Sequence, residues 1–186
     1  LIGDDFILEG DGLEKLKAPM DRIVDIALND KTIAMRTKGV GTLTTATALE
    51  LGAIGPHARA SGVDVDVRRD APYSSYEDFD FNVPVVESGD VFARVVIRAL
   101  ECYESIKIIE QALNKMPAGP INLGNKLIKI KEGMSVALHE APRGQLRHMV
   151  VGNGGLNSHR VSVHVPSYKS TPTIPYTLRN NAVADA

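Results

Sequence analysis

The sequence predicts an α+β fold, in which a helical core with one long helix is joined to a small antiparallel three-stranded meander. Apolar residues recur at spacings of three and four over residues 90–115, which is typical of an amphipathic helix. Beyond Pro120, apolar and polar residues alternate instead, which is typical of half-buried strands. Hydrophobic residues make up 44% of the 186 residues, so the chain can bury a core.

The chain divides into three parts. Residues 1–38 are an N-terminal segment, and we expect them to begin an excised piece of a longer protein. Residues 39–120 form a helical part that contains a charged Gly/Pro loop. Residues 121–186 carry the meander and a C-terminal segment.

Two short helices are expected near the start of the chain. Residues 21–30 place apolar side chains on one face of a short helix. Residues 39–52 predict a second helix, with Thr42 or Thr44 as its N-cap and Gly52 as its C-terminal stop.

The longest predicted helix follows an irregular Gly/Pro-rich loop, residues 52–90. Long loops inside a compact domain are usually functional or disordered, and the apolar residues in this one argue against disorder. Asp90 is expected to begin the helix and to pair with Arg94 one turn later. Pro117 is expected to end it.

The three strands of the meander are predicted over residues 133–140, 145–152 and 159–166. Residues 142–144, Pro-Arg-Gly, make the first tight connection, and the Gly- and Asn-rich residues 152–158 make the second. The stretch HEAPRGQL is therefore the first turn of the meander.

Charge and composition exclude several classes of protein. The net charge of −2 gives no basic footprint for nucleic acid, and no apolar run is long enough to insert into a membrane. Cys102 is the one cysteine, so the chain by itself forms neither a disulfide nor a cysteine-based metal cluster.

Arg143 is the first candidate site residue, and two interpretations are open. It is either a solvated turn cation or a fixed cation aimed at an anion or polar ligand. Pro142 restricts the backbone before it, and Gly144 permits a close backbone approach after it. A stiffened guanidinium is suited to ligand binding. Ser167, at the end of the third strand, either caps the next turn or converges with Arg143 at the same edge of the meander.

Arg59, Arg68 and Arg69 lie in the irregular loop among several aspartates. Such runs are most often surface ion pairs of small energetic value. On a Gly/Pro loop they also suit an internal network or a subunit interface. The five histidines show no metal-ligand spacing, and no metal site is predicted.

Residues 36–186 resemble the large subunit of membrane-bound, energy-converting nickel–iron hydrogenases of the formate hydrogenlyase and Ech type. The motifs that carry the resemblance are GVGTLTTATALELG, SIKIIEQAL, HEAPRGQL and VSVHVPSYKS. The 49-kDa, quinone-site subunit of respiratory complex I shares much of the pattern. The EAPRG form favours the hydrogenase, and the resemblance implies a hydrogenase large-subunit-like fold.

The resemblance also implies roles for single residues. Arg143 matches the arginine that overhangs the open position of the nickel–iron centre, and Pro142 forms the wall beside it. Ser167 matches the hydroxyl group that donates a hydrogen bond to an iron cyanide, and Glu140 is a candidate for holding the turn. Arg59, Arg68 and Arg69 match loop residues placed at the interface with the iron–sulfur small subunit.

In that family two CxxC pairs hold the metal, and an iron carries carbon monoxide and cyanide. Neither pair is present in these residues, so we expect a catalytically inactive fragment that binds no metal. The parent is expected to be an oxidoreductase that reduces protons or oxidises hydrogen. Its expected partners are an iron–sulfur small subunit and membrane-arm subunits, and its expected location is the cytoplasmic face of the membrane. The alternative parent is a complex I-type NADH:quinone oxidoreductase, for which NAD and quinone binding are expected.

Overall fold

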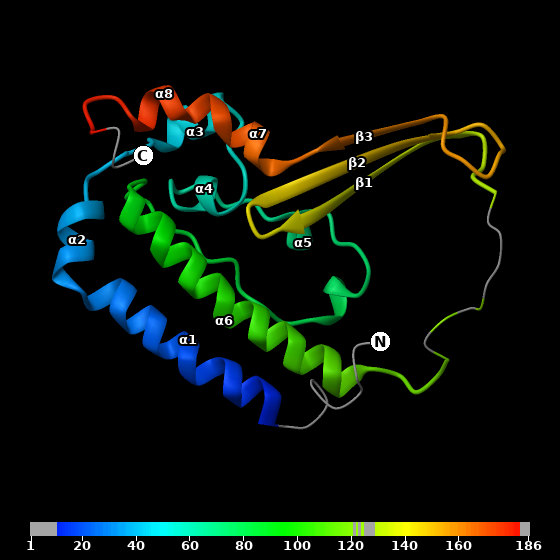
Figure 1. The fold of residues 1–186 in the computed structure, drawn as a ribbon, viewed down its shortest axis with the longest axis horizontal. Helices are drawn as coiled ribbons and strands as arrows, with labels where there is room; N and C mark the ends of the chain where they lie inside the picture. The colour runs from blue at the N-terminus through cyan, green and yellow to red at the C-terminus, as the bar shows by residue number, and fades with distance from the viewer. Residues whose placement is uncertain (1–10, 121, 123, 125–128, 183–186) are drawn as a thin grey trace.

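Figure 1 shows the computed structural model of the chain, and the structure describes residues 11–120, 122, 124 and 129–182. It confirms the predicted fold class, a helical core joined to a three-stranded antiparallel sheet. The beginning of the predicted N-terminal segment and the last four residues lie outside the described residues. Among the described helices, none combines the length and the apolar character that a membrane span needs.

The helices vary widely in length, and α6 is the longest of those described. They are α1 (Asp11–Asn29), α2 (Lys31–Thr37), α3 (Thr45–Glu50), α4 (Gly55–Arg59), α5 (Val67–Asp70), α6 (Val91–Lys115), α7 (Pro166–Ser170) and α8 (Ile174–Thr177), with short 3-10 turns η1 (Tyr76–Asp78) and η2 (Thr171–Thr173).

Helix α6 runs through the middle of the molecule, with α1 on one side and α4 and α5 between α6 and the sheet (Figure 1). It begins as predicted, because the Asp90 carboxylate accepts a hydrogen bond of 2.7 Å from the Ala93 N–H. The charge of Asp90 acts on Arg94, as the predicted pairing requires, but the two side chains form no contact ion pair. The Arg94 guanidinium donates instead to the carbonyls of Gly89, at 2.8 Å, and Gly41, at 2.6 Å.

The first N-terminal helix is longer than predicted, and a second one follows it that the sequence did not predict. Helix α1 begins at Asp11 and contains Pro19, and its Asp21 accepts a hydrogen bond of 2.7 Å from the Tyr103 hydroxyl on α6. The sequence prediction began this helix too late, since α1 continues through Pro19, a residue that ordinarily breaks a helix interior. Helix α2 was not predicted. Asp30 caps it by accepting hydrogen bonds from the N–H groups of Thr32 and Ile33.

The second predicted helix is confirmed over a shorter range, α3. Thr44 is its N-cap and accepts a hydrogen bond from the Thr47 N–H, while Gly52 follows in the left-handed conformation. Small side chains dominate the core beneath it, and they allow α3, α4 and α6 to pack closely. The buried apolar residues of this core include Leu43, Ala48, Ala53, Ala58, Ala60, Val63, Ala93 and Ile97.

The sheet consists of β1 (Gly133–Ala141), β2 (Gly144–Gly152) and β3 (Arg160–His164), in that order and all antiparallel. The predicted strands are confirmed, although β3 is shorter at both ends. Ala141 pairs with Gly144, so Pro142 and Arg143 form the turn between β1 and β2. The sheet projects from the helices, with this turn at its inner end (Figure 1).

Two glycines let the β1–β2 turn rest directly on α4. Gly55 has φ +65° and Gly144 has φ +118°. A Cβ atom on Gly55 would lie 2.3 Å from the Gly144 Cα, and one on Gly144 would lie 2.8 Å from the Gly55 Cα. Only glycine at both positions allows this backbone-to-backbone contact.

Gly55→Ala should therefore lower the free energy of unfolding for two reasons. An alanine is strained in the left-handed backbone conformation, and its Cβ would also collide with the β1–β2 turn. Gly52→Ala is the matched control, because Gly52 has φ +63° and no atom lies within 4 Å of the position that its Cβ would take. The control should cost about 1–2 kcal/mol, the cost of a left-handed alanine. Gly55→Ala should cost at least about 2 kcal/mol more, because the turn must move away from α4. Urea unfolding of both variants measures the difference, and equal losses would contradict the contact.

Candidate functional site

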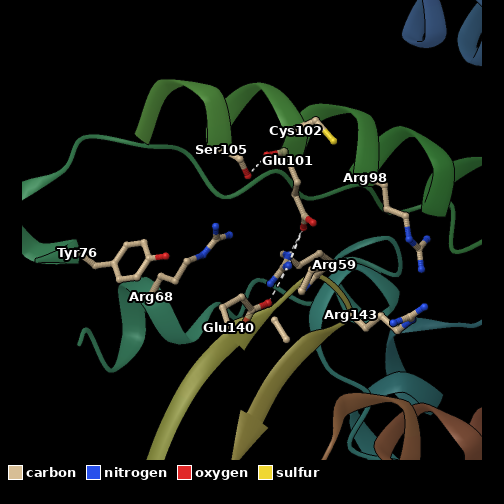
Figure 2. Close-up of a pocket in the computed structure, with 11 residues that line it drawn as sticks. Arg59, Arg68, Tyr76, Arg98, Glu101, Cys102, Ser105, Glu140 and Arg143 are labelled. Carbon is tan, nitrogen blue, oxygen red and sulfur yellow. Dashed lines mark hydrogen bonds and ion pairs between the residues drawn. The ribbon is translucent and has the colours of Figure 1, made fainter. Parts of the chain in front are cut away.

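A pocket of about 500 Å³ opens between α6, the loop around α5 and the β1–β2 turn (Figure 2). Its charged lining residues fall into two groups. One group forms a buried ion network, and the other consists of guanidinium groups with no carboxylate partner among the described residues. The charged lining residues are Arg59, Arg68, Glu101 and Glu140, which belong to the network, and Arg98 and Arg143, which do not.

Arg59 is the centre of the buried network. It is the last residue of α4, and only 1% of its side chain is exposed. Its Nε donates to Glu101 at 2.8 Å, its Nη2 donates to Glu140 at 3.1 Å, and its Nη1 lies 3.2 Å from the Asp66 carboxylate. Its Nη1 also donates to the Val65 carbonyl at 2.9 Å. One guanidinium thus joins the loop before α5, helix α6 and strand β1.

The carboxylates of the network respond differently to their surroundings. Burial raises the pKa of Glu140, and the charge of Arg59 only partly opposes this. Burial also disfavours the charged form of Asp66, but the hydrogen bonds and charge of Arg68, together with the charge of Arg59, bring the Asp66 pKa below its usual value. Arg68 holds Asp66 with both nitrogens of its fork, at 3.0 and 2.7 Å. Of Asp66 and Glu140, Glu140 therefore takes up a proton more readily.

The three loop arginines have different surroundings. Arg59 is enclosed by residues of this chain, and Arg68 pairs with Asp66 in a mostly buried position. Arg69 is 42% exposed and pairs with Asp64 at 2.8 Å and with Asp70 at 2.9 Å. The sequence left open an internal network or a subunit interface, and the structure shows the network for Arg59 and Arg68. Contact of this group with another subunit stays a prediction.

Arg143 is exposed at the tip of the β1–β2 turn, and the structure records no hydrogen bond or ion pair from its side chain to any described residue. Pro142 precedes it in the wall of the pocket, and Gly144 fixes the turn on α4. In Figure 2 the side chains of Arg143 and Arg98 lie on the same side of the Arg59 network, apart from its carboxylates.

Ser167 lies near the start of α7 and is exposed. It lines a second pocket, of about 340 Å³, together with Arg143, Arg98 and His57. Arg143 and Ser167 therefore line one pocket, which agrees with one of the two alternatives that the sequence leaves open for Ser167. The alternative role of Ser167 as a side-chain cap is not seen, because α7 begins after Val165 without a side-chain cap.

His57 is a site residue that the sequence did not predict. Its Nε2 lies 2.9 Å from the Thr173 Oγ1, across 116 residues of sequence. The Thr173 hydroxyl donates to the Ser170 carbonyl at 2.6 Å, so the proton between His57 and Thr173 belongs to His57 Nε2. Burial, followed by the charges of Arg94 and Arg98, lowers the pKa of His57 to about 4. No local sequence motif predicts the contact between His57 and Thr173, because it depends on tertiary structure.

A nickel–iron centre does not fit the donors of this chain alone. By the resemblance to hydrogenases such a centre needs four thiolates, and the sequence has one cysteine, Cys102. Within the described part of the chain, no three His, Cys, Asp or Glu side chains gather in a way that could hold a metal ion.

Comparison with known families bears on the two relationships that the sequence suggests. Residues 9–136 and 125–186 match the family described as respiratory-chain NADH dehydrogenase, 49 Kd subunit. The chain belongs to this family. Its fold class, with a helical core and a small antiparallel sheet, agrees with that membership.

Individual relatives of this 49-kDa family member include two kinds of enzyme subunit. An NADH-quinone oxidoreductase subunit of Desulfotalea psychrophila is 37% identical, and the match covers 87% of this chain and 44% of the relative. The carbon monoxide-induced hydrogenase of Rhodospirillum rubrum is 36% identical, and the match covers 93% of this chain and 48% of the relative. The chain thus spans about half the length of these relatives.

A solved structure matches the whole fold. It is that of the membrane-bound sulfane sulfur reductase, described as an archaeal respiratory membrane complex. The similarity has a TM-score of 0.90 at 31% identity and covers 100% of this chain and 52% of the matched chain. Together these matches confirm the predicted relationship to the 49-kDa subunit. They favour the complex I-type alternative over the hydrogenase, and they do not support the narrower predictions of formate hydrogenlyase and NAD binding.

Acid should destabilise the fold through His57. The unfolded chain takes up this proton near pKa 6.5, whereas the folded chain takes it up only at about 4. The contribution of neutral His57 to the free energy of unfolding is therefore complete above the pKa that His57 has in the unfolded chain. It is lost as the pH falls from about 6.5 to about 4. His57→Gln keeps an N–H donor for Thr173 but does not titrate. The stability advantage of wild type over this variant should shrink across that window.

Chemical unfolding at a series of pH values measures this difference. His159→Gln, at an exposed position before β3, is the matched control for loss of a histidine. A wild-type advantage over His57→Gln that stays constant from about pH 4 to 6.5 would contradict the assignment.

Proposed function

We propose that this chain is part of the 49-kDa-type subunit of a membrane-associated, quinone-reducing oxidoreductase, and that the pocket beside the β1–β2 turn forms part of the quinone chamber. One observation carries the proposal beyond family membership. The guanidinium of Arg143, which has no recorded partner among the described residues, lines a pocket of about 500 Å³. The turn that carries it is held in place by Gly55, Gly144 and the Arg59 network.

Arg143 and Arg98 suit the electrostatic part of quinone chemistry. Reduction of a quinone to a quinol takes two electrons and two protons, and negative charge develops on the ring oxygens on the way. A guanidinium remains protonated, so it does not supply the protons, but it donates hydrogen bonds to an oxygen that gains charge. Pro142 and the ring of Tyr76 offer flat walls in the same pocket.

Glu140 is the group in this wall that suits proton storage. It lines the pocket, its side chain is only 6% exposed, and burial raises its pKa. Arg59 holds its carboxylate in place at 3.1 Å. A carboxyl group with a raised pKa can hold a proton and release it when the charge of the pocket changes.

The setting of the parent protein is part of the same proposal. Electrons would arrive from an iron–sulfur small subunit, and membrane-arm subunits would anchor the complex at the cytoplasmic face of the membrane. The match to an archaeal respiratory membrane complex supports a membrane-bound assembly. Quinone as the substrate is supported by the NADH-quinone oxidoreductase relatives.

A hydrogenase is the second candidate, because the Rhodospirillum rubrum hydrogenase is nearly as similar to this chain as the quinone-reducing relatives are. Arg143, Pro142 and Ser167 would then have the roles that the resemblance implies. The nickel ligands would come from outside these 186 residues.

Replacement of Arg143 tests the quinone proposal. The complex that carries the full-length subunit is purified, reduced with dithionite, freed of excess reductant and mixed with decylubiquinone. We expect reoxidation of the complex by the quinone, and we expect Arg143→Gln to lower kcat/KM by about 100-fold, the usual loss for one charge-stabilising donor. Arg160→Gln, the same charge change at an exposed position on β3, should have little effect.

Metal analysis of the same preparation separates the two candidates. The quinone proposal predicts no stoichiometric nickel. Stoichiometric nickel together with hydrogen evolution would establish the hydrogenase instead. Quinone reduction that is insensitive to Arg143→Gln would show that this pocket is not the quinone site.

A further inference from the structure

The second pocket, lined by Arg98, Arg143 and Ser167, has an unusual charge balance. It lies where α6, the β1–β2 turn and the α7–η2 segment meet, and no Asp or Glu is among its lining residues in the described part of the chain. Arg98 comes from α6 and Arg143 from the turn. Two cations thus face a pocket of about 340 Å³ without a carboxylate in its described wall.

The arginines of the loop around α5, unlike Arg98 and Arg143, have carboxylate partners among the described residues. Arg59, Arg68 and Arg69 each lie within 3.2 Å of at least one carboxylate oxygen. For Arg143 the structure records no partner among the described residues, and Arg98 donates to the carbonyl of Arg94 at 2.9 Å. Most of the donor capacity of these two guanidinium groups is therefore unused in the described structure.

Hydroxyl groups complete the wall on the third side. Thr171 and Thr173 already donate to the carbonyls of Ser167 and Ser170 within the turn. The side chains of Ser167 and Ser170 have no recorded hydrogen bond to the described residues, so both remain available as donors. Available donors thus come from three separate segments of the chain.

We propose that this pocket binds a small tetrahedral oxyanion of the phosphate and sulfate class, held by the guanidinium groups of Arg98 and Arg143 and the hydroxyl groups of Ser167 and Ser170. Guanidinium groups match the oxygens of such anions with paired donors. Donors from three segments suit an anion whose four oxygens point in different directions better than they suit a planar carboxylate.

The state of His57 agrees with a positive field at this site. His57 lines the pocket, and the charges of Arg94 and Arg98 add to burial in keeping it neutral. Burial is the larger cause of the lowered pKa, and of the two contributing cations only Arg98 lines this pocket. An oxyanion in the pocket would be a counterion for Arg98 and Arg143.

This inference goes beyond the proposed quinone chemistry, although Arg98 and Arg143 line both pockets. A bound oxyanion would occupy the same guanidinium groups that the proposed function uses, so the two ligands would compete for them. The test of binding therefore uses a chemical readout that does not depend on enzyme activity.

Arginine-specific labelling with phenylglyoxal measures the occupancy of the site directly. The native complex with the full-length subunit is labelled in chloride and in inorganic phosphate at equal ionic strength, and modification of each arginine is followed by peptide mass spectrometry. At ten times the dissociation constant of phosphate, labelling of Arg98 and Arg143 should slow about tenfold. Labelling of Arg160, exposed on β3, should be the same in both salts.

Three results would overturn the proposal. Equal labelling of Arg98 and Arg143 in phosphate and chloride would show that phosphate does not bind. Absence of labelling in both salts would show that another part of the protein or a partner already covers the two arginines. Equal protection by acetate would refute the preference for a tetrahedral anion.

A serine variant tests the hydroxyl groups independently of the arginines. Ser167→Ala should raise the phosphate concentration that gives half of the maximal protection by about tenfold. This is the usual effect of one hydrogen bond to a charged group. Ser135→Ala, at an exposed position on β1, is the matched control and should leave it unchanged. If Ser167→Ala needs the same phosphate concentration for half of the maximal protection as wild type, Ser167 is excluded from the site.

Discussion

The buried guanidinium of Arg59 is the interaction on which the rest of the site depends. It pairs with Asp66 before α5, Glu101 on α6 and Glu140 on β1, and these three segments have no other shared centre of charge in the described structure. A buried charge is tolerated only when its partners are complete, and every nitrogen of this guanidinium has an acceptor. The network therefore fixes the position of β1 relative to the long helix, and with it the edge of the pocket.

The close contact of Gly55 with Gly144 adds a second constraint at the other end of the same short helix. Helix α4 is thus fixed at its start by backbone contact and at its end by the Arg59 ion network. Between these two points the β1–β2 turn has little freedom. Arg143 is exposed, yet it projects from a rigid support, which is the arrangement that the proposed ligand binding requires.

Local sequence patterns predicted the helices and strands, whereas the candidate site is formed by contacts between residues far apart in the sequence. The periodicity of α6, the Asp90 cap and the alternation of the strands could all be read from neighbouring residues. The partners of Arg59 on α6 and β1 lie 42 and 81 residues away, and the partner of His57 lies 116 residues away. No spacing rule links such residues. The resemblance placed the chain in the right superfamily, but EAPRG did not separate hydrogenase from quinone-site subunit, because both kinds of relative match this chain almost equally.

The most direct test of the central claim is native-state hydrogen exchange of Arg59→Gln against the surface control Arg69→Gln. If Arg59 joins three segments, the variant should lose about 3–5 kcal/mol of stability, because buried carboxylates lose their partner. Amide protection should fall together in residues 62–70, in the middle of α6 and at the β1–β2 turn. Arg69→Gln should cost less than about 1 kcal/mol, as exposed ion pairs usually do. Loss of protection confined to the loop near residue 59, or a cost equal to that of the control, would contradict the account.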